Sequence, residues 1–168
     1  MGADLMFFGS SVRHDRRMDA AAPLIRRATP DDAEAAALMY TASRRSAGAA
    51  LPPAVHTPQE DAWFVREVLI AARETWVAAR GEELLGLLTL DGDWIDQLYL
   101  AGSATGQGLG SRFVDLAKTQ RPSGLQLWTF ASNLPAQRFY ERHGFVAVER
   151  TDGEHNEEHA PDIRYRWN

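Results

Sequence analysis

The chain has 168 residues, of which 45% are hydrophobic and 24% charged, and its formal net charge is −5. This length supports one domain with its own core, and the acidic balance argues against a nucleic-acid binder, which usually carries a basic face. The chain contains no cysteine, which excludes disulfides, thiolate metal sites and a cysteine nucleophile, and is compatible with a reducing compartment. Because no apolar run approaches the length of a membrane span, we expect a cytoplasmic protein without a membrane partner.

The N-terminal half is predicted to contain a flexible extension, one strand and two helices. Residues 1–22 form the extension, which lacks apolar periodicity, and residues 23–168 form the domain. After a predicted strand at 24–28, Thr29-Pro30-Asp31-Asp32 is a helix start signal. The same signal recurs at Thr57-Pro58-Gln59-Glu60-Asp61. The second helix has an inward face made of Phe64, Val68, Leu69 and Ala72.

A strand meander and a glycine loop are predicted in the middle of the chain. The three strands are expected at 75–79, 84–90 and 94–100. The loop Gly106-Gln107-Gly108-Leu109-Gly110 then leads into a helix at about 108–119. A further strand at 125–130 completes a strand–helix–strand unit, so we expect its two strands to be parallel neighbours joined by a right-handed crossover.

The glycine loop has the physical properties of an anion site. A helix start carries unpaired N–H groups and a partial positive charge, and glycine allows a phosphate to approach the backbone. Two standard phosphate loops are excluded, because Ser111-Arg112 follow Gly110 where a P-loop needs Gly-Lys-Ser/Thr, and Ser111 replaces the third glycine of a dinucleotide fingerprint. A purely structural glycine turn is the alternative.

The C-terminal part is predicted to contain one helix and two strands. Asn133 is the expected cap of a helix that reaches His143, with Gly144 just beyond its end. Strands are expected at 145–148 and 163–167, with an acidic loop at 151–162 between them.

Two motifs in this order resemble those of the GNAT superfamily of acetyl-CoA-dependent N-acetyltransferases. The first is Leu98-Tyr99-Leu100 followed by the glycine loop to Ser111, and the second is N-x-x-A-x-x-F-Y-x-x-x-G-F from Asn133 to Phe145. The resemblance covers about residues 24–167. It implies an α/β fold with a mixed sheet of about seven strands, splayed open between the fourth and fifth, and about four helices, of which the first two build one wall of the substrate pocket.

The resemblance also implies where acetyl-CoA, the expected cosubstrate, would bind. The backbone of Leu98, Tyr99 and Leu100 would pair with the pantetheine arm like an added strand, and one N–H group would polarise the thioester carbonyl. Asn133 would contact the same arm. Tyr140 matches the family's general acid, since a phenol of pKa ~10 is protonated at neutral pH and can donate to the departing thiolate. The pyrophosphate would be held by the amides of Gly106, Gln107, Gly108, Leu109, Gly110 and Ser111.

Helical spacing and one departure from the family pattern bear on these roles. Asn133, Gln137 and Tyr140 lie at i, i+4 and i+7 and therefore share one helix face. The alternative for Tyr140 is a packing role in the core, as expected for Phe139. Thr105 stands where the family often has Gln or Arg, and threonine would make a weaker phosphate contact.

The resemblance does not supply the base that takes the proton of the attacking amine. Some family members carry a glutamate on the fifth strand where this chain has Trp128. Asp96, on the fourth strand, is the candidate base, and a solvated acid near a turn is the equally supported interpretation. Glu157, Glu158 and Asp162 on the late loop, or a chain of water molecules, are the other candidates.

No metal is expected. His155-Asn156-Glu157-Glu158-His159 departs from the zincin pattern because Asn156 follows the first histidine, and Gly153 and Pro161 disfavour a helix. This stretch is predicted to be a solvated acidic loop, or one whose carboxylates lie at the pocket mouth and attract a cationic amine.

Together these features predict an enzyme that moves an acetyl group from acetyl-CoA to a primary amine by direct attack. A small-molecule or amino-acid-like acceptor is favoured. The alternatives are a protein or peptide acetyltransferase of the same family with an open groove, and a non-catalytic acyl-CoA-binding sensor. A homodimer is expected by analogy with the family only.

Overall fold

The computed structural model of the chain describes residues 22–168, so the extension predicted for 1–22 lies, apart from its last residue, outside the described residues. Within this range the strands form one seven-stranded sheet in the order β1-β2-β3-β4-β5-β7-β6. The strands are β1 (Leu24–Arg27), β2 (Glu74–Arg80), β3 (Glu83–Asp91), β4 (Trp94–Leu100), β5 (Leu125–Phe130), β6 (Val146–Thr151) and β7 (Asp162–Trp167).

Four α-helices cover the sheet within the described residues, as the sequence predicted. They are α1 (Ala33–Ser46), α2 (Pro58–Trp63), α3 (Leu109–Gln120) and α4 (Leu134–Arg142). Short 3₁₀ turns flank them at η1 (Pro30–Asp32), η2 (Gly48–Ala50) and η4 (Gly102–Ala104). The expected mixed α/β fold is thus confirmed.

Three elements differ from the sequence prediction by more than a one-residue shift of a boundary. The first helix begins as the 3₁₀ turn η1, and the second continues beyond α2 as a π-helical segment, η3 (Phe64–Ile70). The strand predicted at 145–148 instead runs from Val146 to Thr151. Phe145 stays outside this strand, because its buried ring packs against Tyr140, with the ring centroids 5.5 Å apart.

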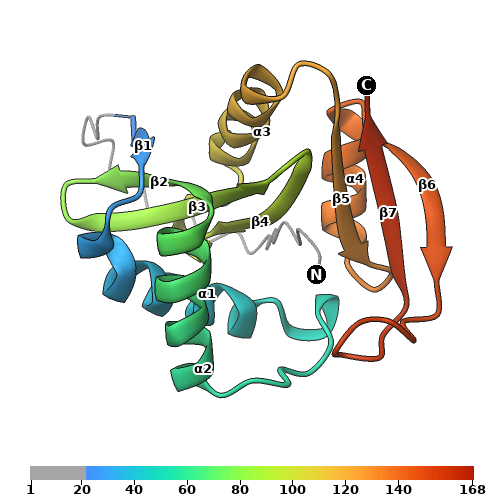
Figure 1. Cartoon of the computed structure of the whole chain (residues 1–168), viewed down its shortest axis with the longest axis horizontal. Helices are drawn as coiled ribbons and strands as arrows, with labels where there is room; N and C mark the ends of the chain where they lie inside the picture. Colours follow the sequence, from blue (N-terminus) through green and yellow to red (C-terminus); the bar gives the residue numbers. More distant parts are fainter. Residues whose placement is uncertain (1–21) are drawn as a thin grey trace.

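The sheet opens between β4 and β5. These strands are parallel, as predicted, but only Trp94 and Gln126 are paired, beside a 2.9 Å hydrogen bond from Gln126 N to Asp93 O. The strands on either side of this opening are paired along their length. Figure 1 shows β1–β4 and the β5–β7–β6 group as two halves that diverge from this point. The opening predicted between the fourth and fifth strands is therefore present.

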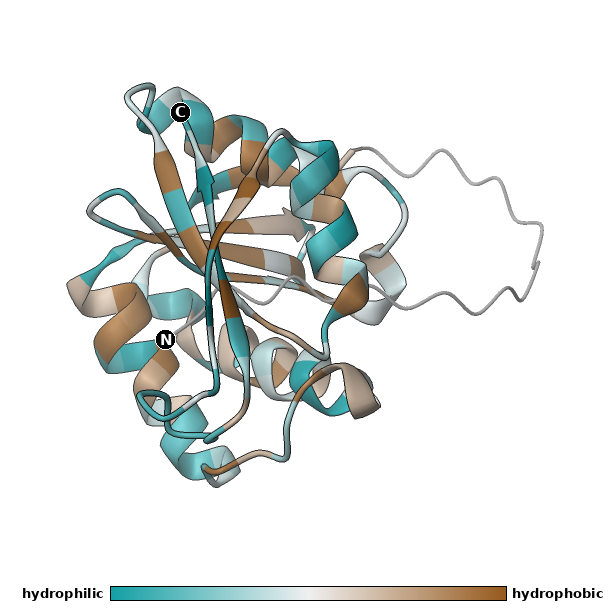
Figure 2. Cartoon of the chain, turned by 90° about the vertical axis from the view of Figure 1, so that its right-hand side faces the viewer, coloured by the Kyte–Doolittle hydropathy of each residue, from teal (hydrophilic) through white to brown (hydrophobic). Residues whose placement is uncertain are grey.

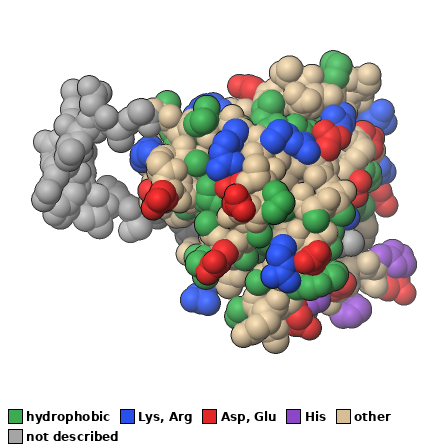
Figure 3. Space-filling model, turned by 60° about the vertical axis from the view of Figure 1, so that its left-hand side comes forward, with side chains coloured by type: hydrophobic (Ala, Val, Ile, Leu, Met, Phe, Trp, Pro, Cys, Tyr) green, Lys and Arg blue, Asp and Glu red, His purple; other side chains and the backbone are tan. Residues whose placement is uncertain are grey.

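Two apolar clusters lie on opposite faces of the sheet. One joins β4 and β5 to α3 and α4, and the other joins β2 and β3 to α1 and η3. Figure 2 shows hydrophobic residues concentrated on the strands and hydrophilic residues on the outer sides of the helices, and on the face in Figure 3 charges of both signs are interspersed. Among residues 22–168, no helix combines the length and apolar character that crossing a membrane requires.

Asp32 ties the first strand to the start of α1. Both terminal guanidinium nitrogens of Arg26 donate to the Asp32 carboxylate at 2.8 Å, and Thr29 donates through its backbone N at 2.8 Å. These hydrogen bonds, above all those from Arg26, lower the pKa of Asp32 to about 2. Bidentate pairing of this kind also fixes the geometry of the strand-to-helix connection.

Replacing Asp32 with Asn is expected to lower the free energy of unfolding at pH 7 by about 1–2 kcal/mol, because the cap and the ion pair are lost. The pKa of Asp32 is lowered in the folded chain from its ordinary value of 3.8. The carboxylate therefore stabilises the fold fully above pH ~4, and this contribution disappears as the pH falls towards 2.

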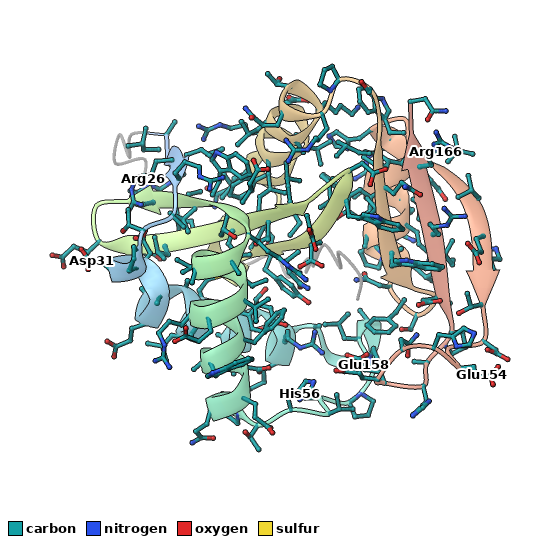
Figure 4. All side chains as sticks on the ribbon, viewed as in Figure 1. Arg26, Asp31, His56, Glu154, Glu158 and Arg166 are labelled. Carbon is teal, nitrogen blue, oxygen red and sulfur yellow. The ribbon has the colours of Figure 1, made fainter. Side chains whose placement is uncertain are left out.

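Urea unfolding at pH 7 and pH 3 measures the effect. Asp31→Asn is the matched control, since Asp31 is the neighbouring acid and points outward in Figure 4. A difference between Asp32→Asn and the wild type that stays constant between the two pH values would contradict this assignment.

Candidate functional site

The edge of β4 presents backbone groups to the opening. On the β3 side of β4, Ala101 N donates to Leu85 O at 2.9 Å, and Leu100 lies opposite Gly86. Backbone groups alternate in direction along an antiparallel strand. The amides of Leu98 and Leu100 therefore face the opening, whereas that of Tyr99 faces β3. Of the three residues predicted to pair with pantetheine, Leu98 and Leu100 thus direct their amides towards the opening between β4 and β5.

The glycine loop leads directly from this strand into α3. Gly106 and Gly108 have φ values of +72° and +81°, and a Cβ added at either would meet no atom within 4 Å. Glycine is thus required at these two positions by the backbone conformation and not by crowding. The first hydrogen bond of the helix runs from Arg112 N to Gly108 O, so the amides of 109–111 precede the helical ladder. These amides can receive an anion.

Close packing fixes α3 against α4. A Cβ on Gly110 would lie 3.3 Å from the ring of Phe139, tighter than most real contacts. Ser111 Oγ lies 3.0 Å from His143 Nε2, and the other ring nitrogen of His143 lies 2.8 Å from Phe139 O. The start of α3 is therefore held in place by α4.

Two side chains near the glycine loop bond to the loop itself. The Thr105 hydroxyl donates to Gly102 O at 2.9 Å, and the Gln107 amide donates to Ser103 O. These bonds shape the turn that leads into α3. A phosphate contact would therefore rest on the backbone amides.

Asn133 and Tyr140 lie on the buried face of α4. Asn133 is 1% exposed and caps the helix by accepting a hydrogen bond from Ala136 N at 3.2 Å. Tyr140 is fully buried in the same apolar cluster as Leu98 and Leu100. The ring centroid of Phe139 is 5.2 Å from that of Tyr140. The structure thus brings the second motif to the β4 strand.

Asp96, the base candidate from the sequence, lies buried at an irregularity in the pairing of β4 with β3. Its carboxylate forms an ion pair with Arg73, which also lies 3.3 Å from Asp91. Burial raises the pKa of Asp96, and the charge of Arg73 opposes that rise. Arg73 and Gln97 line the cavity described next, but Asp96 does not.

A cavity of about 670 Å³ adjoins the opening on the side of α1 and α2. Its walls come from α1, α2, η3, the middle of β4, the end of β5 and the loop after β6. Aromatic side chains and carboxylates dominate these walls. The aromatic residues are Tyr40, Trp63, Phe64, Trp128 and Phe130, and the acids are Glu60, Asp61, Glu157, Glu158 and Asp162.

Two ion pairs join the two halves of the sheet across the mouth of this cavity. Arg44 of α1 lies 3.5 Å from Glu158, and His56 Nε2 lies 2.7 Å from Glu157. Figure 4 shows His56 and Glu158 close to each other at the lower end of the opening. The proximity of Glu157 raises the pKa of His56. The late acidic loop thus lines the cavity.

Asp61 is a site residue that the sequence analysis treated only as part of a helix start signal. It is 8% exposed and lines the cavity. Burial raises the pKa of its carboxyl group, although Arg44 and His56 oppose that rise. A signal was present in the sequence, because Asp61 lies three residues before Phe64 and seven before Val68, on the apolar face of the helix. An acid on that face calls for a partner or a ligand.

No group of three or more His, Asp or Glu side chains among residues 22–168 is placed to hold a metal ion. His155 lines the cavity together with acids of the same loop.

Comparison with known proteins identifies the same region. A family model described as an acetyltransferase (GNAT) domain matches residues 71–147. This segment contains the strands on both sides of the opening, the glycine loop, α3 and α4. The matched part is thus the part that forms the predicted cofactor cleft.

Solved structures share the fold at low sequence identity. The apo form of YjaB from Escherichia coli has a TM-score of 0.70 at 22% identity, covering 86% of this chain and 97% of that chain. A GCN5-related N-acetyltransferase from Rhodopseudomonas palustris has a TM-score of 0.71 at 20% identity, covering 90% of this chain and 98% of that chain. These likenesses extend the family fold beyond the matched segment.

Two curated relatives are similar over part of the chain. Peptidyl-lysine N-acetyltransferase YiaC of Escherichia coli is 28% identical over 87 residues, which are 51% of this chain and 59% of that protein. Peptidyl-lysine N-acetyltransferase YjaB of Salmonella typhimurium is 33% identical over 78 residues, which are 46% of this chain and 53% of that protein. The similarity thus spans little more than half the length of each relative. A GNAT acetyltransferase domain is thus identified over residues 71–147, and the described chain shares the fold of solved GNAT proteins.

Proposed function

We propose that the protein transfers an acetyl group from acetyl-CoA to a primary amine. The observation that carries this proposal is the opening between β4 and β5, where a strand edge with outward-facing amides leads into the unpaired amides at the start of α3. An extended thioester ending in a pyrophosphate matches this arrangement, because a strand edge pairs with an extended chain and a helix start binds phosphate.

In this proposal the pantetheine arm pairs with Leu98 and Leu100, and the glycine loop from Gly106 to Ser111 receives the pyrophosphate. A β4 amide that faces the opening donates to the thioester carbonyl and stabilises the oxyanion formed when the amine attacks. The buried cap Asn133 lies on α4 beside this path. Acetyl-CoA supplies the activated acetyl group, and the chain supplies the surface that orients it.

Tyr140 is the proposed general acid. It lies in the apolar cluster shared with β4, on the side of the opening where α3 and α4 pack. A protonated phenol there gives the leaving sulfur a proton, so that CoA departs as a thiol and not as a thiolate. Asp96 remains the base candidate from the sequence, although its ion pair with Arg73 occupies the carboxylate that would take the proton.

The acceptor is proposed to be a small or amino-acid-like amine, because the cavity is bounded by α1, α2 and the late loop. A lysine side chain of a peptide is the second candidate, favoured by the names of the two curated relatives. Five carboxylates line the cavity against two arginines, and this balance attracts a cationic amine of either kind. The cytoplasmic location and the homodimer stay predictions.

Tyr140→Phe is expected to lower kcat by about 10²–10³-fold, because the departing sulfur loses its proton donor. Acetyl-CoA affinity should stay within about twofold of the wild type, since the phenyl ring preserves the packing. Calorimetric titration with acetyl-CoA, followed by free-thiol release with an amine panel, measures both. Unchanged turnover would remove Tyr140 from the acid role, and wild-type binding without transfer to any amine would favour an acyl-CoA sensor.

Gly108→Ala is expected to weaken acetyl-CoA binding about tenfold, because alanine disfavours the left-handed conformation that aims the amides of the glycine loop. Gly81→Ala is the matched control. Gly81 also has a positive φ, of +60°, with no atom within 4 Å of an added Cβ, but lies in the β2–β3 turn. Both variants should lose similar stability, and only Gly108→Ala should lose affinity. Equal affinities would assign the glycine loop a structural role alone.

A further inference from the structure

Asp61 differs from every other carboxylate that lines the cavity. Glu157 and Glu158 are paired with His56 and Arg44, and Asp162 accepts hydrogen bonds from Asn156 and Thr151. Glu60 accepts a hydrogen bond from Thr57 N at 2.7 Å and caps α2. Among residues 22–168, none donates a hydrogen bond to the Asp61 carboxylate or forms an ion pair with it.

A buried carboxylate without a partner costs desolvation energy that folding alone does not recover. Asp61 is 8% exposed, yet every buried side-chain oxygen of the described residues that is closed to solvent has a partner. The Asp61 oxygens therefore face the open space of the cavity. A group in that position is available to a ligand.

Asp61 also lies where two cavities meet. A second cavity, of about 710 Å³, is lined by α1 and by the connection from α1 to α2. It shares Arg44, Ala54, His56 and Asp61 with the first cavity. The Asp61 carboxylate is thus part of the wall of both cavities.

We propose that Asp61 binds the ammonium group of the acceptor and takes its proton before attack. This inference rests on the proposed acetyl transfer. It replaces Asp96 as the base, because Asp96 is bound to Arg73 and does not line the cavity, whereas Asp61 lines it without a partner. Burial also raises the pKa of Asp61, which makes its carboxylate a stronger base than an exposed aspartate.

One ammonium proton moves to the Asp61 carboxylate and from there to solvent, which leaves a neutral amine with a free electron pair. That pair forms the C–N bond to the thioester carbon, and the C–S bond then breaks with its electrons on sulfur. Sulfur takes a proton from Tyr140, while the second proton on nitrogen passes to solvent and Tyr140 is reprotonated from solvent. The net products are an amide, a free thiol and one proton.

The test compares Asp61→Asn with Asp96→Asn and with Glu67→Gln. Glu67 is the matched control, since it lies in η3, is bonded to Arg66 and lines neither cavity. The acceptors are phenethylamine, free lysine and a lysine-containing peptide. The measurements are kcat/KM from pH 6 to pH 10, the melting temperature, and calorimetric titration of the acetyl-CoA-loaded protein with each amine.

Asp61→Asn is expected to lower kcat/KM at pH 7 by about 10²–10³-fold. The deficit should shrink about tenfold per pH unit as the free amine becomes neutral in solution and needs no base. The amine should also bind at least tenfold more weakly. The melting temperature should match the wild type, because no hydrogen bond is lost, and Asp61→Glu should restore part of the activity at pH 7.

Two results would overturn the inference. One is an Asp61→Asn variant with the pH profile and amine affinity of the wild type, and the other is an Asp96→Asn variant that alone loses the pH-dependent activity. Failure of the proposed function looks different, because the wild type would then acetylate none of the amines. In that case the calorimetric affinity for the amine still tests the role of Asp61. Equal amine affinities of the wild type and Asp61→Asn would overturn that role.

Discussion

The incomplete pairing of β4 with β5 is the constraint on which the rest of the molecule depends. A parallel pair joined by a helical crossover would normally close into a continuous sheet. Here the pairing stops after Trp94 and Gln126, and helices pack against both faces of the sheet around the opening. The opening leaves the amides of Leu98 and Leu100 without a strand to pair with, and that edge is the surface on which the proposed cofactor site is built.

Local features of the chain were predictable because their causes are local. Helix starts with Thr-Pro followed by acids, the Asn133 cap and the glycine loop before α3 depend on residues within one or two turns, and all appear where expected. The order of strand, helix and strand also fixed the parallel relation of β4 and β5. The shift of β6 was missed because Phe145 is apolar like a strand residue but is held by the ring of Tyr140.

Pairings between distant segments could not be predicted, and they decide which acid is available. Arg73 lies 23 residues before Asp96, and Arg44 lies 114 residues before Glu158. The position of Asp61 on an apolar helix face is a local signal, but it does not show whether an arginine pairs with this acid in the folded chain. The availability of these acids to a ligand depends on which arginine the folded chain brings next to them, and only the three-dimensional structure contains that information.

The two sides of the opening separate the groups that the proposed reaction needs. Tyr140 belongs to the cluster under α3 and α4, whereas Asp61 lies on the face of α1 and α2. Because the attacking nitrogen and the leaving sulfur are bonded to one carbon in the intermediate, both groups must reach a single point. The opening between β4 and β5 connects the two faces, so a sheet closed at this position would keep the amine from the thioester.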